Sequence, residues 1–154
     1  MIKVLFVCHG NICRSPMAEF LMKDLVTKRG LAAQFEIASA ATSREEIGNP
    51  VHPGTRKKLE EHHISCAGKR AVQLTKKDYD HYDYLIGMDR CNLINMRRIV
   101  GNDPQEKLHL LLDFPSLSRD VADPWYTGDF DQTYDDVLLG CTALLDSIIS
   151  KNEL

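Results

Sequence analysis

Short apolar runs alternate along this chain with longer stretches that are apolar on one side only. Residues 2–7 are almost entirely apolar and lead into a polar segment, which is typical of a strand buried on both faces. Three more runs, at 35–38, 83–88 and 107–112, also predict strands. Helices are predicted at 16–26, 53–63, 76–82 and 89–100, and a last one contains 137–148. The clearest apolar helix faces consist of Ala18, Leu21, Met22, Leu25 and Val26, and of Val137, Cys141, Leu144, Leu145 and Ile148.

Strands that alternate with helices in this way predict parallel βαβ units. We therefore expect an α/β fold: a small doubly wound four-stranded parallel sheet with helices on both faces, in three α/β/α layers. Residues 1–154 are expected to form a single domain. Ligand sites in such sheets lie at the carboxyl ends of the strands. The segments that follow the first and the fourth predicted strand should therefore meet at one edge.

Composition limits the cellular compartment and the partners that we expect for this protein. A hydrophobic share of 44% and a charged share of 27% are ordinary for a globular protein. The net charge of −3 argues against a nucleic-acid partner. No apolar stretch approaches the roughly 18 residues of a membrane span, and the chain begins in a strand rather than a signal peptide. Five irregularly spaced cysteines suit a reducing compartment better than a disulfide framework. We expect a cytoplasmic monomer without a membrane partner.

The segment CHGNICRSP, residues 8–16, joins the first predicted strand to the first predicted helix. Ser15 is the predicted N-cap, with Pro16 at the first helical position. Gly10 lets the backbone approach a ligand closely, and Asn11 is a residue type that tolerates positive φ. Free N–H groups at a helix N-terminus favour an oxyanion. This loop is therefore predicted to bind phosphate.

Two side chains give the loop its chemistry. Arg14 presents a planar guanidinium that can contact two phosphate oxygens at once. The same positive surroundings favour the thiolate form of Cys8, and the Ser15 hydroxyl is placed to donate to it. A thiolate held beside a bound phosphate is a nucleophile for attack on phosphorus.

Several other kinds of site are absent from the sequence. There is no GxxxxGK[ST] motif of an NTPase loop and no GxGxxG dinucleotide fingerprint. The chain also lacks HExxH and CxxC patterns, and the adjacent His62 and His63 point in different directions on a helix. We expect neither a metal nor a cofactor.

The pattern CxGNxCRSP and a later Asp123-Pro124-Trp125-Tyr126 segment, at this spacing and chain length, resemble the low-molecular-weight protein tyrosine phosphatase family. The resemblance covers essentially the whole chain. It implies that Cys8 is the nucleophile, Arg14 the phosphate clamp and Asp123 the general acid and base of a metal-independent phosphatase. It further implies a phosphate and substrate site formed by His9, Gly10, Asn11, Ile12, Cys13, Ser15, Trp125 and Tyr126, with Ser39 supporting Asn11. Phosphotyrosine proteins or small aryl phosphates are the implied substrates.

The residues themselves agree with these roles. A phenolate leaving group needs a proton, which a carboxylic acid near the loop can supply. Aromatic side chains suit a flat substrate ring. For Cys13 two interpretations stay open. It either forms a reversible disulfide with Cys8 that protects the oxidised nucleophile, as in relatives, or it only packs beneath the loop. Cys66, Cys91 and Cys141 are expected to be packing or surface residues.

This chain departs from the family pattern at three places. Arg44-Glu45-Glu46 stands where many relatives have aromatic residues, which adds charge at the pocket mouth. Lys69 stands where relatives often have a histidine. If that histidine holds the loop asparagine, Asn11 must find another partner here. His9 follows the nucleophile and is expected to line the rim.

Three alternatives use the same residues differently. A thioredoxin-coupled arsenate reductase needs two further cysteines a few residues apart, whereas Cys66 and Cys91 are 25 positions apart. Members that resemble a protein arginine phosphatase tend to carry Thr in place of Ile12, and an apolar Ile12 favours a phenyl ring. A non-catalytic phosphate-binding module has no need of both a thiol nucleophile and an acid. These considerations favour the tyrosine phosphatase.

Overall fold

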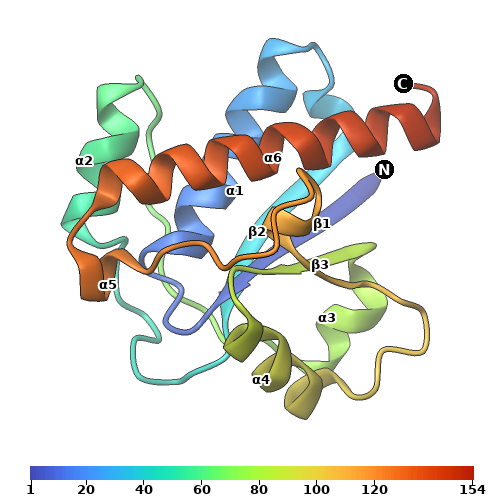
Figure 1. Ribbon diagram of the computed structural model, residues 1–154, viewed down its shortest axis with the longest axis horizontal. Helices are drawn as coiled ribbons and strands as arrows, with labels where there is room; N and C mark the ends of the chain where they lie inside the picture. Colours follow the sequence, from blue (N-terminus) through green and yellow to red (C-terminus); the bar gives the residue numbers. More distant parts are fainter.

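A computed structural model describes residues 1–154 and contains one parallel sheet with the strand order β2-β1-β3-β4 (Figure 1). The strands are β1 (Ile2–Cys8), β2 (Phe35–Ala41), β3 (Tyr84–Gly87) and β4 (Leu108–Leu110). The predicted four-stranded parallel sheet is confirmed. The fourth strand is shorter than predicted, because residues Leu111–Asp113 turn into a 3₁₀ helix.

Six α-helices surround the sheet. They are α1 (Arg14–Lys28), α2 (Pro53–Glu61), α3 (Lys76–His81), α4 (Arg90–Val100), α5 (Pro124–Thr127) and α6 (Phe130–Asn152). Helices α1 and α6 lie on one side of the strands and α3 and α4 on the other, which confirms the three α/β/α layers (Figure 1). No helix in the structure combines the length and the apolar character needed to cross a bilayer.

The central strand β1 is buried on both faces. Val4, Phe6 and Cys8 belong to a large apolar cluster with α1 and α6, whereas Leu5 and Val7 belong to a second cluster with α3 and α4. Alternate residues of a strand point to opposite faces, so a strand between two helix layers needs apolar residues at every position. This explains the unbroken apolar run at 2–7. It also brings Cys8 to the carboxyl end of the innermost strand.

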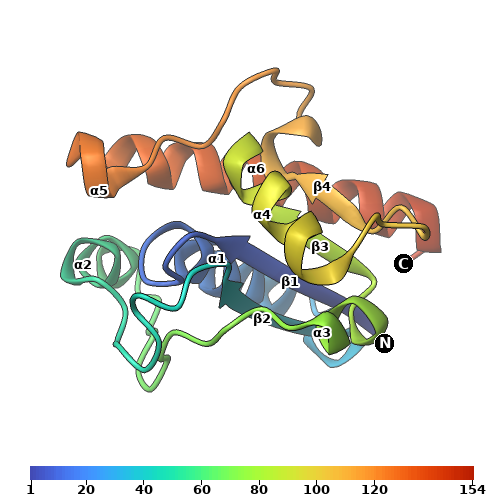
Figure 2. The ribbon, with the colours of Figure 1, turned by 90° about the horizontal axis from the view of Figure 1, so that it is seen from below.

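The functional loops gather at one end of the sheet. Figure 2 shows the carboxyl end of β1 with α2 and α5 at the same end of the molecule, while both chain termini lie at the other end. The segment after β1 and the segment containing Asp123 therefore share an edge, as predicted from the strand order.

Several helices differ from the sequence predictions; α2, for example, ends at Glu61 rather than at 63, and α3 ends at His81 rather than at 82. The N-cap of α1 is Cys13, not Ser15, and Pro16 is the third helical residue rather than the first. Proline is tolerated there because the first N–H groups of a helix have no intrahelical partner. Residues Pro124–Thr127, predicted as loop, form α5, and α6 begins at Phe130 with Asp129 as its cap. The predicted Asp89 cap of α4 is confirmed, since its Oδ1 accepts a hydrogen bond from the Asn92 backbone N–H at 2.7 Å.

Candidate active site

The loop between β1 and α1 directs two hydrogen-bond donors at the sulfur of Cys8. The Asn11 backbone N–H donates to Cys8 Sγ at 3.3 Å, and Ser15 Oγ lies 3.0 Å from the same sulfur. Ser15 Oγ accepts from Asn11 Nδ2 at 2.8 Å, which leaves its own proton free to donate to sulfur. Ser15 is the second residue of α1, so its hydroxyl contacts Cys8 and does not cap the helix. Both donors stabilise a thiolate at Cys8.

Asn11 fixes the shape of the loop from behind. Its φ is 59°, so the predicted positive φ is confirmed. Its Nδ2 donates to Ser15 Oγ and, at 2.9 Å, to Ser39 Oγ, while its Oδ1 accepts from the Val72 N–H at 3.1 Å. The expected contact with Ser39 is therefore present. The backbone of Val72, three residues after Lys69, is thus a further partner of Asn11 in this chain.

Lys69 supports Asn11 indirectly, through Ser39. Its Nζ donates to the Ser39 carbonyl at 2.8 Å and lies 3.4 Å from Oε1 of Glu19, a carboxylate that is only 4% exposed. Ser39 Oγ donates to that same Oε1 at 2.6 Å. Burial lowers the pKa of Lys69, while the nearby Glu19 carboxylate opposes this shift. Glu19 was not predicted from the sequence, because it lies on the first helix and meets Ser39 and Lys69 only in the fold.

We expect Lys69→Met to lower the free energy of unfolding by about 1–3 kcal/mol, because it leaves the buried Glu19 with fewer partners. The substitution should also lower kcat/KM several-fold, since Ser39 and Asn11 lose their anchor. Urea unfolding and steady-state kinetics measure the two effects. Lys23→Met is the matched control, since Lys23 also pairs with Glu19 (2.6 Å) but does not contact Ser39. Activity losses of equal size in the two variants would argue against a specific role for Lys69.

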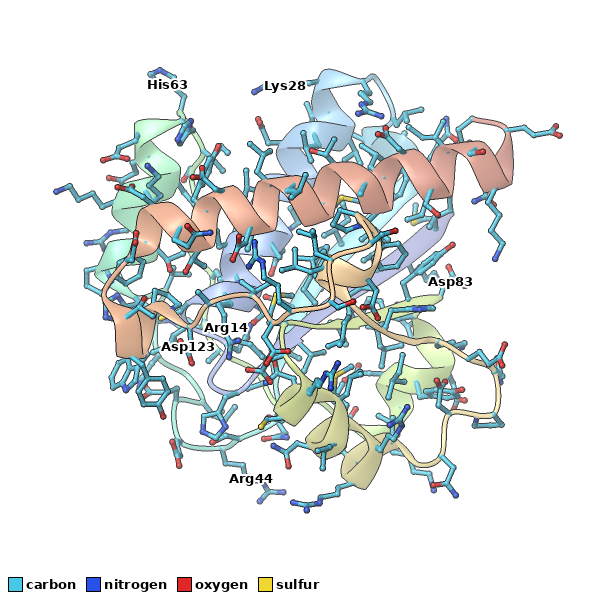
Figure 3. All side chains as sticks on the ribbon, in the orientation of Figure 1. Arg14, Lys28, Arg44, His63, Asp83 and Asp123 are labelled. Atoms are coloured by element: carbon cyan, nitrogen blue, oxygen red, sulfur yellow. The ribbon has the colours of Figure 1, made fainter.

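Arg14 is held between two acidic loops. Its side chain is 3% exposed, and Nη1 donates to Asp89 Oδ2 at 2.8 Å and to the Val121 carbonyl at 3.1 Å. Nη2 donates to Asp123 Oδ2 at 3.3 Å. Figure 3 shows Arg14 and Asp123 beside each other below α6. Although burial opposes a positive charge, Cys8, Asp123 and Asp89 raise the pKa of Arg14 above its usual value, so it remains a cation.

Asp89 serves two purposes, and the sequence indicated only one of them. Its Oδ1 caps α4, and its Oδ2 orients the guanidinium of Arg14. The second contact was predictable, because Asp89 is an acidic residue directly after a predicted strand. It therefore lies at the edge where the phosphate loop was expected.

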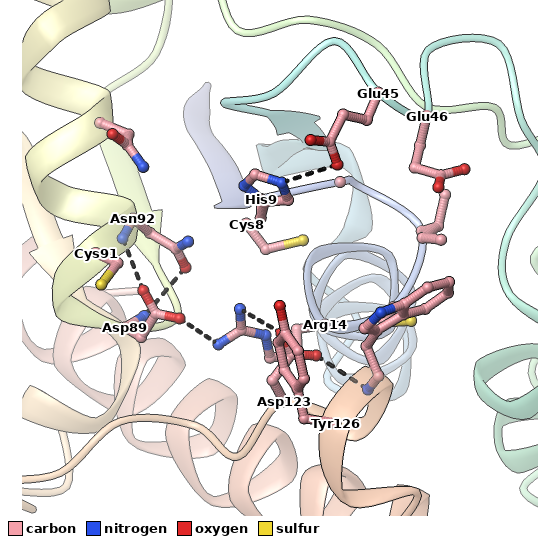
Figure 4. Close-up of a pocket in the computed structure, with 15 residues that line it drawn as sticks. Cys8, His9, Arg14, Glu45, Glu46, Asp89, Cys91, Asn92, Asp123 and Tyr126 are labelled. Carbon is pink, nitrogen blue, oxygen red and sulfur yellow. Dashed lines mark hydrogen bonds and ion pairs between the residues drawn. The ribbon is translucent and has the colours of Figure 1, made fainter.

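Asp123 is the N-cap of α5 and faces Arg14. Its Oδ1 accepts from the Trp125 N–H at 3.1 Å, and Pro124 occupies the first helical position. Figure 4 shows the carboxylate below Cys8 and next to Arg14. The two motifs singled out in the sequence, at residues 8–16 and 123–126, thus meet at one site.

These side chains surround a cavity of about 350 Å³. Trp125 and Tyr126 line it as neighbouring aromatic residues, which we call the aromatic wall, and they are 59% and 84% exposed. Glu45 and Glu46 lie at the mouth, where Glu45 Oε2 is 3.3 Å from His9 Nε2 (Figure 4). The lining consists of Cys8, His9, Gly10, Ile12, Cys13, Arg14, Glu45, Glu46, Asp89, Cys91, Asn92, Asn95, Asp123, Trp125 and Tyr126.

Two features of this lining differ from the sequence predictions. The side chains of Asn11 and Ser15 were expected to contact the substrate, but they lie behind the loop and do not line the cavity. They support the loop instead. Residues Cys91, Asn92 and Asn95 of α4 form a wall that was not predicted. No local pattern predicts this wall, because only the crossing of α4 over the sheet edge brings these residues to the pocket.

Cys13 lines the same cavity as Cys8. Burial, followed by the charge of Cys8, raises the pKa of Cys13 to about 12, so this residue is a neutral thiol near neutral pH. Its position at the far end of the same short loop keeps both interpretations of Cys13 open.

A buried arginine, a thiol with two donors and a carboxylate at the edge of a parallel sheet define a phosphate-directed cysteine site of the phosphatase class. Residues 3–154 match the family model described as low molecular weight phosphotyrosine protein phosphatase. The chain therefore belongs to this family, and its relatives support a phosphatase hydrolase activity.

Relatives match the chain over its full length. It is 42% identical to the low molecular weight protein-tyrosine-phosphatase YfkJ of Bacillus subtilis, covering all of both chains, and 40% identical to PtpA of Staphylococcus epidermidis, covering all of this chain and 98% of the relative. The crystal structure of YfkJ superimposes with a TM-score of 0.94 over 100% of this chain and 98% of that one. The Streptococcus pyogenes phosphatase SP-PTP, 42% identical, gives a TM-score of 0.88 over 99% and 97%.

Proposed function

We propose that this protein hydrolyses phosphotyrosine and small aryl phosphates through a phosphocysteine intermediate on Cys8. The observation that carries the proposal is the convergence of Cys8, Arg14 and Asp123 on one cavity, with an aromatic wall beside them. The direct test is hydrolysis of a phosphotyrosine peptide and of para-nitrophenyl phosphate. An inactive, correctly folded protein would contradict the proposal.

The first chemical step transfers the phosphoryl group to sulfur. The Cys8 thiolate attacks phosphorus while Arg14 and the loop N–H groups hold the phosphate oxygens. The phosphorus–sulfur bond forms and the bond to the phenolic oxygen breaks. The leaving phenolate takes its proton from the carboxylic acid of Asp123, so that no unstable anion is released.

The second step regenerates the enzyme. Asp123, now a carboxylate, takes a proton from water, and the water oxygen attacks phosphorus. The phosphorus–sulfur bond breaks, inorganic phosphate leaves, and the Ser15 hydroxyl and Asn11 N–H stabilise the returning thiolate at 3.0 and 3.3 Å. Two donors at the sulfur make Cys8 a better leaving group, which is what this step requires.

The alternative activities are less well supported. A disulfide relay needs two further cysteines a few residues apart. Cys91 lines the pocket, but Cys66 is buried and does not, so these two do not form such a pair at the site. Ile12 and the two aromatic residues of the wall favour a phenyl ring over a guanidinium. Parallel assays with phosphotyrosine and phosphoarginine peptides, and with arsenate and a thiol reductant, distinguish these activities.

The charges at the pocket mouth predict a preference among peptides. Glu46 is held by Asn49, whose Nδ2 donates to Glu46 Oε2 at 2.6 Å, and Glu45 is largely exposed. We expect peptides with basic residues beside the phosphotyrosine to be favoured. Changing both glutamates to glutamine should reduce the ratio of kcat/KM for basic over acidic peptides by about two- to fivefold, the size of exposed charge interactions.

The control for this prediction is the double variant Glu60→Gln with Glu61→Gln on α2, which removes the same charge outside the pocket. Added salt should weaken the preference of the wild type, because exposed charges are screened. A preference that survives both the Glu45/Glu46 change and high salt would show that the rim charges do not select peptides.

Oxidation separates the two interpretations of Cys13. Peroxide converts the Cys8 thiolate to a sulfenic acid, and attack by the sulfur of Cys13 forms a disulfide with loss of water. We expect Cys13→Ala to be inactivated by peroxide at a similar rate but to recover at least about threefold less activity after dithiothreitol, because sulfenic acid left without a partner oxidises further. Cys91→Ala is the control in the same pocket. If Cys13→Ala recovers its full activity, Cys13 only packs beneath the loop.

The setting of the enzyme follows from the same features. We propose that the enzyme is a monomer that acts on phosphotyrosine proteins. We propose a cytoplasmic location, because a working thiolate requires reducing surroundings. The net charge of −3 supports neither nucleic acid nor an anionic membrane as a partner.

A further inference from the structure

We propose that His52 is a positioning residue that connects the phosphate loop to the aromatic wall of the pocket. It does not line the cavity, and it directly precedes α2. Its backbone N–H donates to the Ile12 carbonyl at 2.8 Å, so the residue is fixed to the phosphate loop. Its ring Nδ1 accepts from the Gly54 N–H at 3.0 Å and thereby caps α2. The Thr55 hydroxyl adds a second link from α2 to the loop through the Cys13 carbonyl at 3.3 Å.

The ring of His52 also contacts the other side of the site. It stacks on Phe130, with centroids 5.2 Å apart and planes inclined by 21°, and meets Trp125 edge-on at 5.9 Å and 80°. Both distances are typical of stabilising aromatic pairs. The fit is tight, because a Cβ at Gly54 would lie 2.3 Å from the Phe130 ring. His52 is therefore held in one place by its neighbours.

This arrangement places His52 between the two halves of the catalytic site. Trp125, whose ring meets that of His52, donates its backbone N–H to Asp123 Oδ1 at 3.1 Å. Trp125 belongs to a helix of only four residues and is otherwise 59% exposed, so few other contacts fix it. The His52 ring therefore sets where the aromatic wall stands relative to the loop that holds the phosphate.

Trp125 is the only tryptophan in the chain, so its fluorescence reports this wall directly. His52→Asn retains a side-chain oxygen that can cap α2 but removes the ring. We expect the emission of Trp125 to change in this variant, and KM for para-nitrophenyl phosphate to rise about three- to tenfold, the size of one lost aromatic contact. The dissociation constant of inorganic phosphate, measured from the rise in unfolding temperature with added phosphate, should stay within about twofold, because that ligand makes no use of the wall.

Two further variants make the test specific. His52→Phe restores a ring without the Nδ1 acceptor and should bring emission and KM back toward the wild type. His62→Asn is the matched control, because His62 stacks on Tyr134 at 4.2 Å, also next to α2 and α6 but outside the pocket. It should change neither emission nor KM.

Only the KM measurement rests on the proposed phosphatase activity, since fluorescence and phosphate binding require no turnover. Should the wild type be inactive, the emission of His52→Asn still decides whether His52 positions Trp125. Unchanged emission and KM in His52→Asn would overturn the inference, as would equal changes in His62→Asn. If circular dichroism shows that His52→Asn does not fold, Phe130→Leu removes the same stack from the other side and is expected to give the same shift.

Discussion

Replacing Cys8 with serine is expected to lower kcat by about 10⁴-fold or more while phosphate binding persists. A serine hydroxyl near neutral pH is not ionised, so the nucleophile of the first step is lost. The groups that hold phosphate are unaffected, because Arg14 keeps its contacts with Asp89 and Val121, and Asn11 keeps its contacts with Ser39 and Val72. The loop should therefore still bind the product.

Two measurements separate catalysis from binding in this variant. Turnover of para-nitrophenyl phosphate is followed in the presence of a chelator, where the wild type should remain active. Phosphate binding is followed as the rise in unfolding temperature with added phosphate, since a ligand of the folded state stabilises it. Cys91→Ser is the matched control, because it removes another thiol from the same pocket. Wild-type turnover by Cys8→Ser would rule out the covalent scheme.

The second large effect is expected for Asp123→Asn, and it depends on the leaving group. Loss of the general acid should lower kcat by about 10²–10⁴-fold for phosphotyrosine, whose phenolate needs a proton. An aryl phosphate with a strongly electron-withdrawing ring should lose far less, because its phenolate leaves unaided. Asparagine is a good N-cap and retains an oxygen for the Trp125 N–H, so α5 should stay in place.

The comparison that interprets this result is Asp89→Asn. Asp89 contacts the same guanidinium as Asp123, at 2.8 Å compared with 3.3 Å, but faces no leaving group in the proposed scheme. Its substitution should slow all aryl phosphates by a similar factor. A plot of log kcat against leaving-group pKa for each variant shows the difference. Equal slopes for Asp123→Asn and the wild type would mean that Asp123 is not the acid.

Elements that bury many apolar residues were the ones that the sequence predicted well. The unbroken run in β1 and the apolar faces of α1 and α6 follow from burial between layers, and nearly all of their predicted core positions are buried. Helix α5 was missed, because four residues are too few to show a helical period. The N-cap of α1 was misplaced: the helix begins at Arg14, before Ser15, and the Ser15 hydroxyl contacts Cys8.

In the candidate site, too, the local features were predictable from the sequence and the contacts between distant segments were not. Cys8, Arg14 and Asp123 were found because their motifs are local in sequence, and the strand order predicted that they meet. Contacts between distant segments gave no such pattern. The pair of buried Glu19 and Lys69 and the ring contacts of His52 join residues that are from 50 to 78 positions apart. Only the fold shows them.

The central claim is that phosphate passes through the sulfur of Cys8. Its most direct test is to quench the wild type in acid during hydrolysis of a phosphotyrosine peptide and to locate phosphate on the enzyme by mass spectrometry. We predict phosphate on Cys8, absent from Cys8→Ser and absent when no substrate is added. Phosphate found on a different residue during turnover, or a Cys8→Ser enzyme that still turns over without it, would contradict this account.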